Sequence, residues 1–403
     1  MQFPQRFSAL PEYAFPRLRA LLDHHEAGGP VLHMSIGEPK HPFPDYVPGL
    51  IMRFADGFNQ YPPNEGSPEL RAAISAYISG RYGVATDPDT QIMALNGTRE
   101  GLFNTCLALC PEEKNGAQPV VLLPNPFYQC YMVAAVTAGA EPVFVPAPQE
   151  NGFLPDFASV PTELLDRTAV VYLCSPSNPQ GAVASAEYWQ DLLRLAEKHD
   201  FRVFADECYA EIYRGTPPYG ALQAAQDVGA DPERVVVFHS LSKRSNLPGM
   251  RSGFVASGPK NLVAIKRLRA YTGAPLPLPI QQVSAYVWAD EDHAAANRAR
   301  YAKKFDIADR ILGDCAGYTS PQAGFFLWLN VGDGEKAALK LWRETGVRVL
   351  PGKYLSNTTD PRLGGGNPGA EFVRVALVAE EQDIERGLTA IRACLASELG
   401  GGE

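Results

Sequence analysis

The sequence predicts an α/β protein with a mostly parallel sheet that carries helices on both faces, joined to a smaller α+β domain. Three observations lead to this prediction. Short apolar segments alternate with longer amphipathic segments, which is typical of strands and their crossover helices. The pattern changes after about residue 285. The chain, with 403 residues, is also too long for one small domain.

Buried strands are predicted where short apolar runs rich in β-branched residues occur. These runs cover 119–123, 142–145, 169–174, 201–207, 234–240 and 253–257. The clearest helix between them spans 185–199. It begins with Ser185 as a suitable N-cap, and its apolar face is formed by Trp189, Leu192, Leu193 and Ala196. Repeated strand–helix–strand units of this kind favour a parallel sheet.

The C-terminal part of the chain has a different pattern and predicts an α+β domain. Its expected elements are a helix over 297–314, strands over 325–331 and 372–378, and helices over 334–345 and 381–397. A helix-like stretch within 1–40 can pack against either part of the protein. We therefore expect a large domain over 45–285 and a small domain formed by 1–44 together with 286–403.

Composition and charge narrow the range of functions. The net charge is −9, so neither nucleic acid nor an anionic membrane is an expected partner. Seven cysteines are scattered without a CxxC pair, which indicates reduced thiols and neither a disulfide framework nor a metal site. The N-terminal sequence MQFPQRFSAL lacks the apolar core of a signal peptide, and no apolar run is long enough to span a bilayer. A cytoplasmic location is expected.

The segment SLSKRSNLPGMRSGF at 240–254 carries the strongest chemical signal. Lys243 follows a predicted strand, and ligands of parallel sheets bind where the strands end. A lysine in that place can form a Schiff base with an aldehyde. Ser240, Ser242 and Arg251 offer hydroxyl groups and a guanidinium group that suit a phosphate. A solvated basic loop is the alternative explanation of the same residues.

Two further segments place polar side chains at the ends of predicted strands. Asp206 closes the strand in FRVFADECYAEIY, and a buried carboxylate requires a cationic partner such as a protonated ring nitrogen. Tyr209 and Asn178, the latter in CSPSNPQGAV, can donate hydrogen bonds to an oxygen of the same ring. Taken singly, Asp206 is also explained as the N-cap of a helix, and Asn178 as an ordinary turn residue.

The segments NGTREGLF and NPFYQCY complete the set of candidates. Gly97, Thr98 and Arg99 open a predicted helix, whose free N–H groups and dipole can bind an anion. Phe127 or Tyr128 can stack on a planar ring, although an aromatic residue in such a place more often packs in the core. Each motif is ambiguous alone, so the argument rests on their order along the chain.

In this order the motifs resemble the class I/II aminotransferases, which are pyridoxal-phosphate (PLP) enzymes of fold type I. The resemblance extends over nearly the whole chain, from SIGEP at 35–39 through YPPNEGSPELR at 61–71 to FVRVAL at 372–377. It implies a large domain with a seven-stranded sheet and a smaller domain beside it. It also implies that Lys243 forms the Schiff base with PLP and moves a proton between the substrate α-carbon and the cofactor.

The resemblance assigns the remaining motifs to parts of the cofactor. Asp206 matches the residue that pairs with the pyridine nitrogen, and Tyr209 and Asn178 match those that hold the phenolate oxygen. Tyr128 matches the residue that stacks on the ring, which is sometimes tryptophan in the family. The residues that match the phosphate ligands are Gly97, Thr98, Arg99, Ser240, Ser242 and Arg251.

Substrate and subunit contacts are implied in the same way. Arg374 matches the arginine that clamps the substrate α-carboxylate, with Gly37 beside it, and a bidentate guanidinium suits that planar group. Asn178 and Arg269 are further candidate substrate ligands; Arg269 matches a position that reads a side-chain carboxylate in aspartate-type relatives. Tyr61 matches a tyrosine that reaches the phosphate of the other subunit, so a homodimer with shared active sites is expected.

Several segments are also similar to the N-succinyldiaminopimelate aminotransferases of bacterial lysine biosynthesis. They are 240–254, NGTREGLF, PNPFYQCY, DECYAEIY and the run over 323–355. The implied reaction is a ping-pong transfer of the amino group from glutamate to N-succinyl-2-amino-6-oxopimelate. The Pro-rich stretch at 269–282 is less typical of this subgroup. Aspartate, alanine and acetylornithine are therefore kept as alternative substrates.

Three other functions share some of these residues. A PLP-dependent C–S lyase uses the same lysine, aspartate and arginine, and a regulatory protein can bind PLP without catalysis. The acidic charge argues against a regulator that binds DNA. A nicotinamide-dependent oxidoreductase is suggested by the string GGGNPG at 364–369. That string follows no predicted strand and contains a proline, so it indicates a flexible loop.

Overall fold

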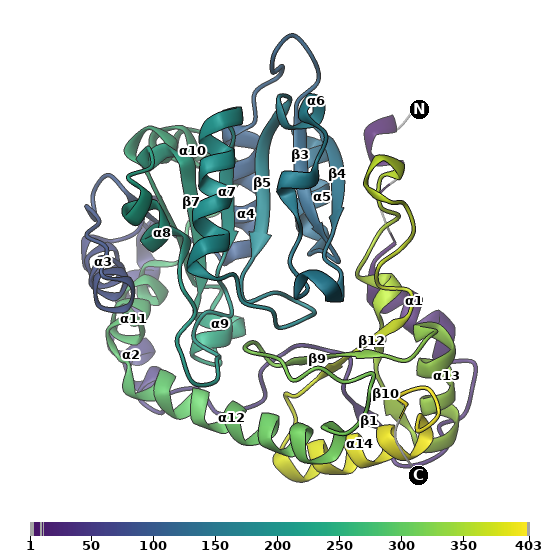
Figure 1. Ribbon diagram of the computed structural model, residues 1–403. Coiled ribbons are helices and arrows are strands. Elements are labelled where there is room, and N and C mark those ends of the chain that lie inside the picture. Colours follow the sequence, from purple (N-terminus) through teal and green to yellow (C-terminus); the bar gives the residue numbers. More distant parts are fainter. Residues whose placement is uncertain (1–3, 9, 11, 401–403) are drawn as a thin grey trace.

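A seven-stranded sheet forms the centre of the upper part of the molecule in Figure 1. The structure is a computed structural model that describes residues 4–8, 10 and 12–400. Within these residues the strands of the sheet follow the order β2 (Ile92–Leu95), β8 (Gly253–Ser257), β7 (Val235–Ser240), β6 (Arg202–Asp206), β5 (Thr168–Cys174), β3 (Val120–Asn125) and β4 (Glu141–Pro146). The sheet therefore contains the six predicted strands and one more.

The strand directions bring several loops to one edge of this sheet. Strands β3 to β7 pair in parallel, whereas β8 is antiparallel to both β7 and β2. Strand β2 consequently ends at the same edge as the five parallel strands. In the register of the ladder Cys174 lies opposite Asp206, and Asp206 lies opposite Phe238. Residues that follow these strands in the sequence thus become neighbours in space.

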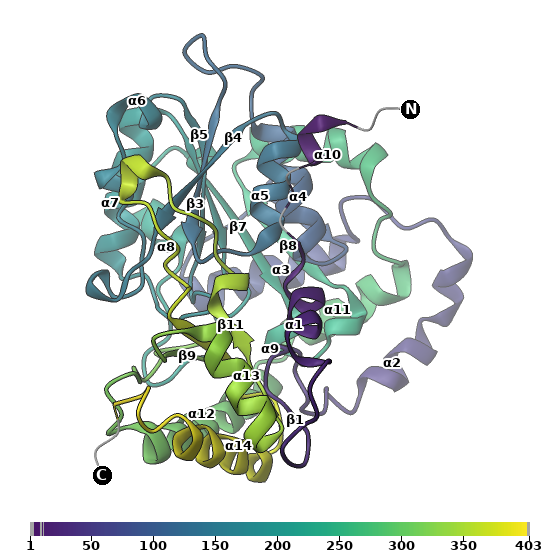
Figure 2. The same ribbon diagram turned by 90° about the vertical axis from the view of Figure 1, so that its right-hand side faces the viewer.

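Helices cover both faces of the sheet, and two hydrophobic clusters fill the layers between them. One face carries α3 (Pro68–Tyr82), α7 (Ala186–His199), α8 (Ala221–Val228) and α11 (Leu278–Ala289). The other carries α4 (Thr98–Leu109), α5 (Gln129–Thr137) and α10 (Pro259–Thr272). Figure 2 shows α7 and α8 on one side of the strands and α4 and α5 on the other. The short helices α2 (Val47–Arg53), α6 (Thr162–Leu165) and α9 (Leu241–Arg244) add residues to the first cluster.

The predicted helix over 185–199 is confirmed in its start and its apolar face. The Ser185 side chain accepts a hydrogen bond from the Tyr188 N–H group (3.1 Å), which caps the first turn of α7. Trp189, Leu192 and Leu193 are buried against the sheet. A serine cap followed by an apolar stripe at helical spacing was sufficient to place this element.

A second group of strands and helices lies beneath the large sheet in Figure 1. Strands β9 (Phe326–Asn330), β11 (Leu350–Pro351) and β12 (Phe372–Ala376) form an antiparallel sheet in the order β11-β12-β9, and β1 (Leu32–His33) pairs with β10 (Val347–Arg348). Around them lie α1 (Ala14–Leu22), α12 (Asp292–Leu312), α13 (Gly334–Thr345) and α14 (Glu381–Cys394). A separate hydrophobic cluster joins β1, β9 and β12 to α12, α13 and α14, and the buried residues of α1 pack in a smaller cluster with Trp342, Leu350 and Tyr354.

The α/β architecture is confirmed, and the differences from prediction concern one missed strand and the ends of elements. Strand β2 was not predicted, because Ile92–Leu95 is only four residues long. Helix α12 begins at Asp292, before the predicted start, and α14 ends at Cys394, before the predicted end. The boundaries of the two domains stay a proposal. Among the described residues, no helix combines the length and the apolar character needed to cross a bilayer.

Candidate active site

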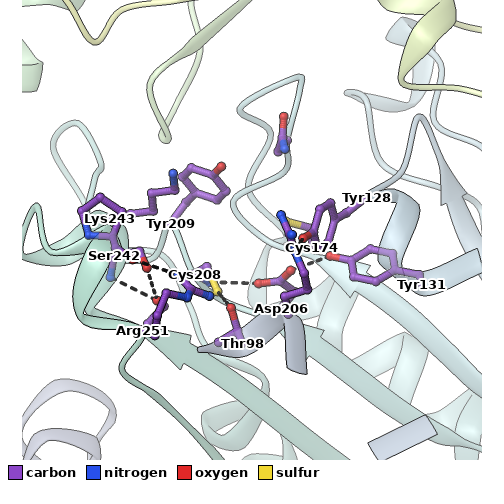
Figure 3. A pocket seen from close by; sticks show the side chains of 14 residues that line it. Thr98, Tyr128, Tyr131, Cys174, Asp206, Cys208, Tyr209, Ser242, Lys243 and Arg251 are labelled. Carbon is purple, nitrogen blue, oxygen red and sulfur yellow. Dashed lines mark hydrogen bonds between the residues drawn. The ribbon is translucent and has the colours of Figure 1, made fainter. Parts of the chain in front are cut away.

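A cavity of about 230 Å³ lies at the edge where the parallel strands end (Figure 3). Its walls come from the segments that follow β2, β3, β5, β6 and β7. The sequence-predicted residues that line it are Thr98, Arg99, Tyr128, Asn178, Asp206, Tyr209, Ser240, Ser242, Lys243 and Arg251. The structure therefore gathers candidates that are more than 150 residues apart in the sequence, from Thr98 to Arg251, into one place.

Lys243 projects its amine into this cavity from α9, which follows β7 directly. Its Nζ donates a hydrogen bond to the Gly37 carbonyl oxygen (2.6 Å) and lies 5.2 Å from the ring centre of Phe325. Burial lowers the pKa of Lys243 to about 8, and the positive charges of Arg374 and Arg251 act in the same direction. An amine with this pKa is available as a base or nucleophile close to neutral pH.

The backbone that carries Lys243 is fixed by a residue from α12. The Asn297 side-chain amide donates hydrogen bonds to the carbonyl oxygens of Lys243 (3.1 Å) and Arg244 (3.2 Å). Arg244 is buried and donates to Glu291 Oε1 (2.6 Å). These contacts satisfy carbonyl groups that the end of a four-residue helix leaves free, so the position of the amine is held from outside the sheet.

Asp206 lies at the end of β6 with its carboxylate at the base of the cavity, and only 6% of its surface is exposed. Tyr131 donates its phenol to Asp206 Oδ2 (2.5 Å), and the Cys208 N–H group donates to Oδ1 (3.3 Å). The Tyr131 ring in turn stacks on Tyr172 at 4.4 Å. No Lys, Arg or His side chain in the described residues forms an ion pair with Asp206, so its charge is left for a ligand cation.

One end of the cavity is built to receive an anion. Ser240 and Ser242 place their hydroxyl oxygens 2.9 Å apart, close to the start of α4 at Thr98. Gly97 precedes this helix with φ of +80°, and a Cβ atom there would lie 2.1 Å from Arg251 Nη2. Glycine is therefore required for the guanidinium group to reach this position. Hydroxyl groups, helix N–H groups and a guanidinium group together suit a phosphate.

Tyr128 and Tyr209 place aromatic side chains on different walls of the cavity. The Tyr128 ring meets Tyr131 edge-on at 5.5 Å, and its hydroxyl accepts a hydrogen bond from Arg99 Nε (2.6 Å). Tyr209 is 8% exposed and packs edge-on against Phe325 at 5.3 Å. A planar ligand in the cavity would therefore meet an aromatic ring and a phenol from different sides.

A second hollow of about 190 Å³ adjoins the first and shares Tyr128, Asn178 and Tyr209 with it. Arg374 of β12 lies in its wall, where Nη1 donates to Asn178 Oδ1 (2.9 Å) and Nη2 donates to the Ser35 carbonyl oxygen (2.7 Å). Burial lowers the pKa of Arg374 to about 10. No carboxylate of the described chain pairs with this buried guanidinium group, which is a strong binding site for an anionic ligand group.

Gly37 forms the floor of this second hollow beside Arg374. A Cβ atom at Gly37 would lie 2.3 Å from the Phe326 ring, and that ring also lies 4.1 Å from the Arg374 guanidinium carbon. The close approach of backbone and ring therefore needs glycine. Both residues predicted for the substrate carboxylate, Gly37 and Arg374, are thus placed together.

Apart from Gly97, which lies against Arg251, two predicted site residues are not among those that line these hollows. Arg269 is fully buried, and its guanidinium group is bound to Glu100 Oε1 (2.6 Å) and to the Asn64 carbonyl oxygen (2.8 Å). This arginine holds α10 against α4. The prediction that Arg269 binds the substrate is therefore corrected, because its guanidinium group is buried inside the fold. Tyr61 is fully exposed and does not line the cavity of its own subunit.

Sequence reasoning missed Tyr131, Cys174 and the contact made by Cys208. All three line the cavity, and Cys208 Sγ lies 3.2 Å from Thr98 Oγ1. Tyr131 follows Tyr128 by three residues at the start of a helix, so the two side chains lie on the same side of that helix. This spacing was the one signal for Tyr131 in the sequence. The string GGGNPG at 364–369 lies between a short 3-10 turn and β12, and no helix begins there. The oxidoreductase alternative therefore has no structural support.

A sheet covered by helices on both faces, with a buried lysine, an unpaired carboxylate and an anion cradle at one edge, defines a cofactor-dependent enzyme of the α/β class. The sequence model of the family "Aminotransferase class I and II" matches residues 30–391, so the chain belongs to this family. Members of the family depend on PLP. The chain is therefore a PLP-dependent aminotransferase.

Individual relatives agree with this assignment. An LL-diaminopimelate aminotransferase of Dehalococcoides mccartyi is 30% identical over 399 residues, which cover 96% of this chain and 97% of the relative. A crystal structure of an aminotransferase from Neisseria meningitidis is 36% identical with a TM-score of 0.92, covering 98% of this chain and 100% of that one. A Thermus thermophilus protein named "probable N-succinyldiaminopimelate aminotransferase" is 25% identical with a TM-score of 0.82, covering 95% and 100%.

The residues of the cavity fit PLP in type and in arrangement. The buried Asp206 carboxylate pairs with no cation in the part of the chain that the structure describes, which suits a protonated pyridine nitrogen. The cradle that Gly97 keeps open for Arg251 suits the phosphate. The Lys243 amine lies in the same cavity and suits the aldehyde.

The lowered pKa of Lys243 predicts how the apoprotein takes up PLP at different pH values. Attachment needs the neutral amine, whose fraction for a pKa of about 8 rises from about a tenth at pH 7 to about nine tenths at pH 9. The rate of attachment, followed by visible absorbance after rapid mixing, should therefore rise about tenfold between pH 7 and pH 9 and then level off. A rise of about tenfold per pH unit that continues to pH 10 would indicate an ordinary lysine pKa and contradict this prediction.

Proposed function

We propose that this aminotransferase moves the amino group between glutamate and N-succinyl-2-amino-6-oxopimelate in lysine biosynthesis, so that N-succinyl-LL-2,6-diaminopimelate and 2-oxoglutarate are formed. The observation that carries the amino-acid part is the buried Arg374 guanidinium group next to Lys243. The diaminopimelate part is supported by relatives whose names contain diaminopimelate. A specific alternative is free LL-diaminopimelate, which is in the name of the Dehalococcoides mccartyi relative.

Each residue of the cavity has a proposed task in holding PLP. Asp206 would accept a hydrogen bond from the protonated ring nitrogen. Tyr209 and Asn178 would donate hydrogen bonds to the ring oxygen, and Tyr128 would stack on the ring. The phosphate is held by Gly97, Thr98, Arg99, Ser240, Ser242 and Arg251. When bound, PLP supplies an aldehyde that captures the amino group and a ring that withdraws electrons from the substrate α-carbon.

Arg374 is the proposed anchor of the substrate. Within the described residues its buried charge has only neutral oxygen partners, Asn178 Oδ1 and the Ser35 carbonyl, so a substrate carboxylate supplies the missing negative charge. A planar carboxylate matches the guanidinium fork in geometry. Because this hollow adjoins the one that Lys243 enters, an anchored amino acid has its α-carbon next to the lysine amine.

Lys243 is the proposed base and acid of the reaction. Its Nζ takes the proton from the substrate α-carbon and gives it back on the other side of the transferred nitrogen. The lowered pKa of this amine keeps part of it neutral at pH 7, as a base requires. The hydrogen bonds from Asn297 to the backbone at Lys243 and Arg244 hold the lysine in the position from which its amine takes up that proton.

A homodimer with shared active sites is the proposed assembly. The fully exposed Tyr61 is the residue expected to contribute to the phosphate site from the partner. Large apolar side chains near it in sequence, Met52 and Phe58, are also well exposed, as is Tyr271 at the end of α10. Exposed apolar residues in such number suit a subunit interface. We also propose a cytoplasmic location for this protein.

A comparison of amino acceptors tests the proposed substrate. With glutamate as donor, kcat/KM should be highest for N-succinyl-2-amino-6-oxopimelate, measured by the formation of 2-oxoglutarate. The matched competitors are the same compound without the succinyl group, oxaloacetate, pyruvate and N-acetylglutamate semialdehyde. A higher value for the uncapped compound would favour the LL-diaminopimelate alternative. Release of pyruvate and ammonia from cystathionine without an acceptor would instead indicate a C–S lyase.

A further inference from the structure

A third hollow, much larger than the other two, opens beside the cofactor cavity. Its volume is about 980 Å³, and its walls come from the N-terminal segment, α4, α5 and the turn at 248–251. It shares Arg99, Tyr128 and Arg251 with the cofactor cavity, and it shares Tyr13, Tyr128 and Gln129 with the hollow that contains Arg374. The three spaces are therefore continuous around Tyr128.

The hollow around Arg374 is too apolar to hold a second charged group. Apart from Arg374, it is lined by aromatic and aliphatic side chains with the amides of Asn178 and Gln129. An amino acid anchored by Arg374 thus finds apolar surface for its methylene groups and no counter-charge for a distant carboxylate. A long side chain that ends in a charge has to continue past Tyr13 and Gln129 into the large hollow.

Arg99 and Arg251 are the cations that line the large hollow, and the Arg251 guanidinium group lies against Gly97, at the end that suits the phosphate. Arg99 Nε donates to the Tyr128 hydroxyl (2.6 Å), and no carboxylate of the described residues pairs with the Arg99 guanidinium group. The two carboxylates that line the hollow are already engaged: Glu100 binds Arg269 (2.6 Å), and Glu38 lies 3.6 Å from Lys40. The amides of Asn96, Asn104 and Gln129 add neutral hydrogen-bonding groups to the same wall.

We infer that the large hollow is the subsite for a carboxylate-terminated acyl group on the distal nitrogen of the substrate, and that Arg99 binds its terminal carboxylate. This inference rests on the proposed function and gives Arg99 a second task besides the phosphate contact. The start of α4 binds the phosphate through backbone N–H groups, which any residue at position 99 would supply. The Arg99 side chain reaches the Tyr128 hydroxyl and lines the large hollow.

The test compares two acceptors in the PLP-loaded enzyme, N-succinyl- and N-acetyl-2-amino-6-oxopimelate, which differ in the terminal carboxylate of the cap. At saturating PLP, Arg99→Gln should lower the ratio of kcat/KM for the succinyl compound to kcat/KM for the acetyl compound by about 10- to 100-fold, the worth of one charge-assisted contact. A weaker affinity for PLP would lower both values together and leave this ratio unchanged. Arg99→Lys, which keeps the charge, should retain part of the preference. Arg267→Gln, an exposed arginine on α10, is the matched control.

Equal losses for both acceptors, or a weaker affinity for PLP that accounts for the loss, would overturn the inference and leave Arg99 with the phosphate alone. Unchanged rates for both acceptors would overturn it as well. Failure of the proposed function has a different signature: the wild-type enzyme would then use neither capped acceptor well, and the result would be visible before any variant is made.

Discussion

Lys243→Ala is expected to lower the rate of transamination by on the order of 10⁴-fold, because proton transfer by one positioned group and covalent attachment are lost together. The change removes the amine that enters the cavity from α9 but leaves Asp206 and Arg374 in place. Single-turnover measurements with glutamate isolate this effect from product release. Added methylamine should restore part of the rate, because a small amine can act in the space left by the side chain.

The control for this prediction is Lys266→Ala. Lys266 is an exposed lysine of α10 that pairs with Glu65 at 2.7 Å and lies outside the cavity lining. Its replacement should leave the rate within about twofold of the wild type, as for most surface changes. A Lys243→Ala protein that keeps more than a tenth of the wild-type rate without added amine would refute the role assigned to Lys243.

Asp206→Asn is expected to lower kcat/KM for glutamate by about 10²- to 5 × 10³-fold. The carboxylate is 6% exposed and has no cationic partner among the described residues, so its charge is matched by the ring nitrogen when PLP is bound. Loss of one partner of a buried ion pair costs about 3–5 kcal/mol. At 1.36 kcal/mol for each factor of ten, this cost corresponds to the stated range.

Asparagine keeps the size of aspartate and can still accept from the Cys208 N–H group, so the fold should be unaffected. Asp191→Asn, at an exposed position where Asp191 pairs with Arg194, provides the matched control. A wild-type value of kcat/KM in the Asp206→Asn enzyme would mean that the charge of Asp206 is not used, and the assignment of the ring nitrogen to this residue would be withdrawn.

The sequence predicted those parts of the fold that local patterns determine. The strands of the large sheet are short apolar runs, and the start of α7 is a serine cap that binds the Tyr188 N–H group. Strand β2 escaped prediction because four apolar residues do not distinguish a strand from the start of a helix. The antiparallel direction of β8 also follows from pairing with β7 and β2, which no local pattern records.

The sequence predicted the part of the site that is formed by residues at or near the ends of strands. Asp206 is the last residue of a parallel strand, Lys243 and Asn178 lie within four residues of the end of one, and such ends meet at one edge. Contacts between distant segments were not predictable, such as the phenol of Tyr131 on Asp206 and the Asn297 amide on the Lys243 carbonyl. Both depend on how α5 and α12 pack against the sheet.

Arg269 shows the limit of an argument from matching positions. A guanidinium group at that position can read a substrate carboxylate only if it is exposed to the active site. In this chain Glu100 and the Asn64 carbonyl take up the guanidinium group inside the fold. Burial and pairing of a charged side chain depend on tertiary contacts, which the motif does not contain.

The attachment point of PLP tests the central claim most directly. Lys304 is also buried, and its pKa is likewise lowered to about 8, so reactivity of the amine alone does not select Lys243. The position of Lys243 in the lining of the cavity, which Lys304 does not share, selects Lys243. Reduction of the PLP-loaded protein with borohydride, followed by digestion and peptide mass spectrometry, should find the reduced cofactor on the peptide that contains Lys243. Cofactor mass on a peptide with Lys304 or any other lysine, with Lys243 unmodified, would contradict the account.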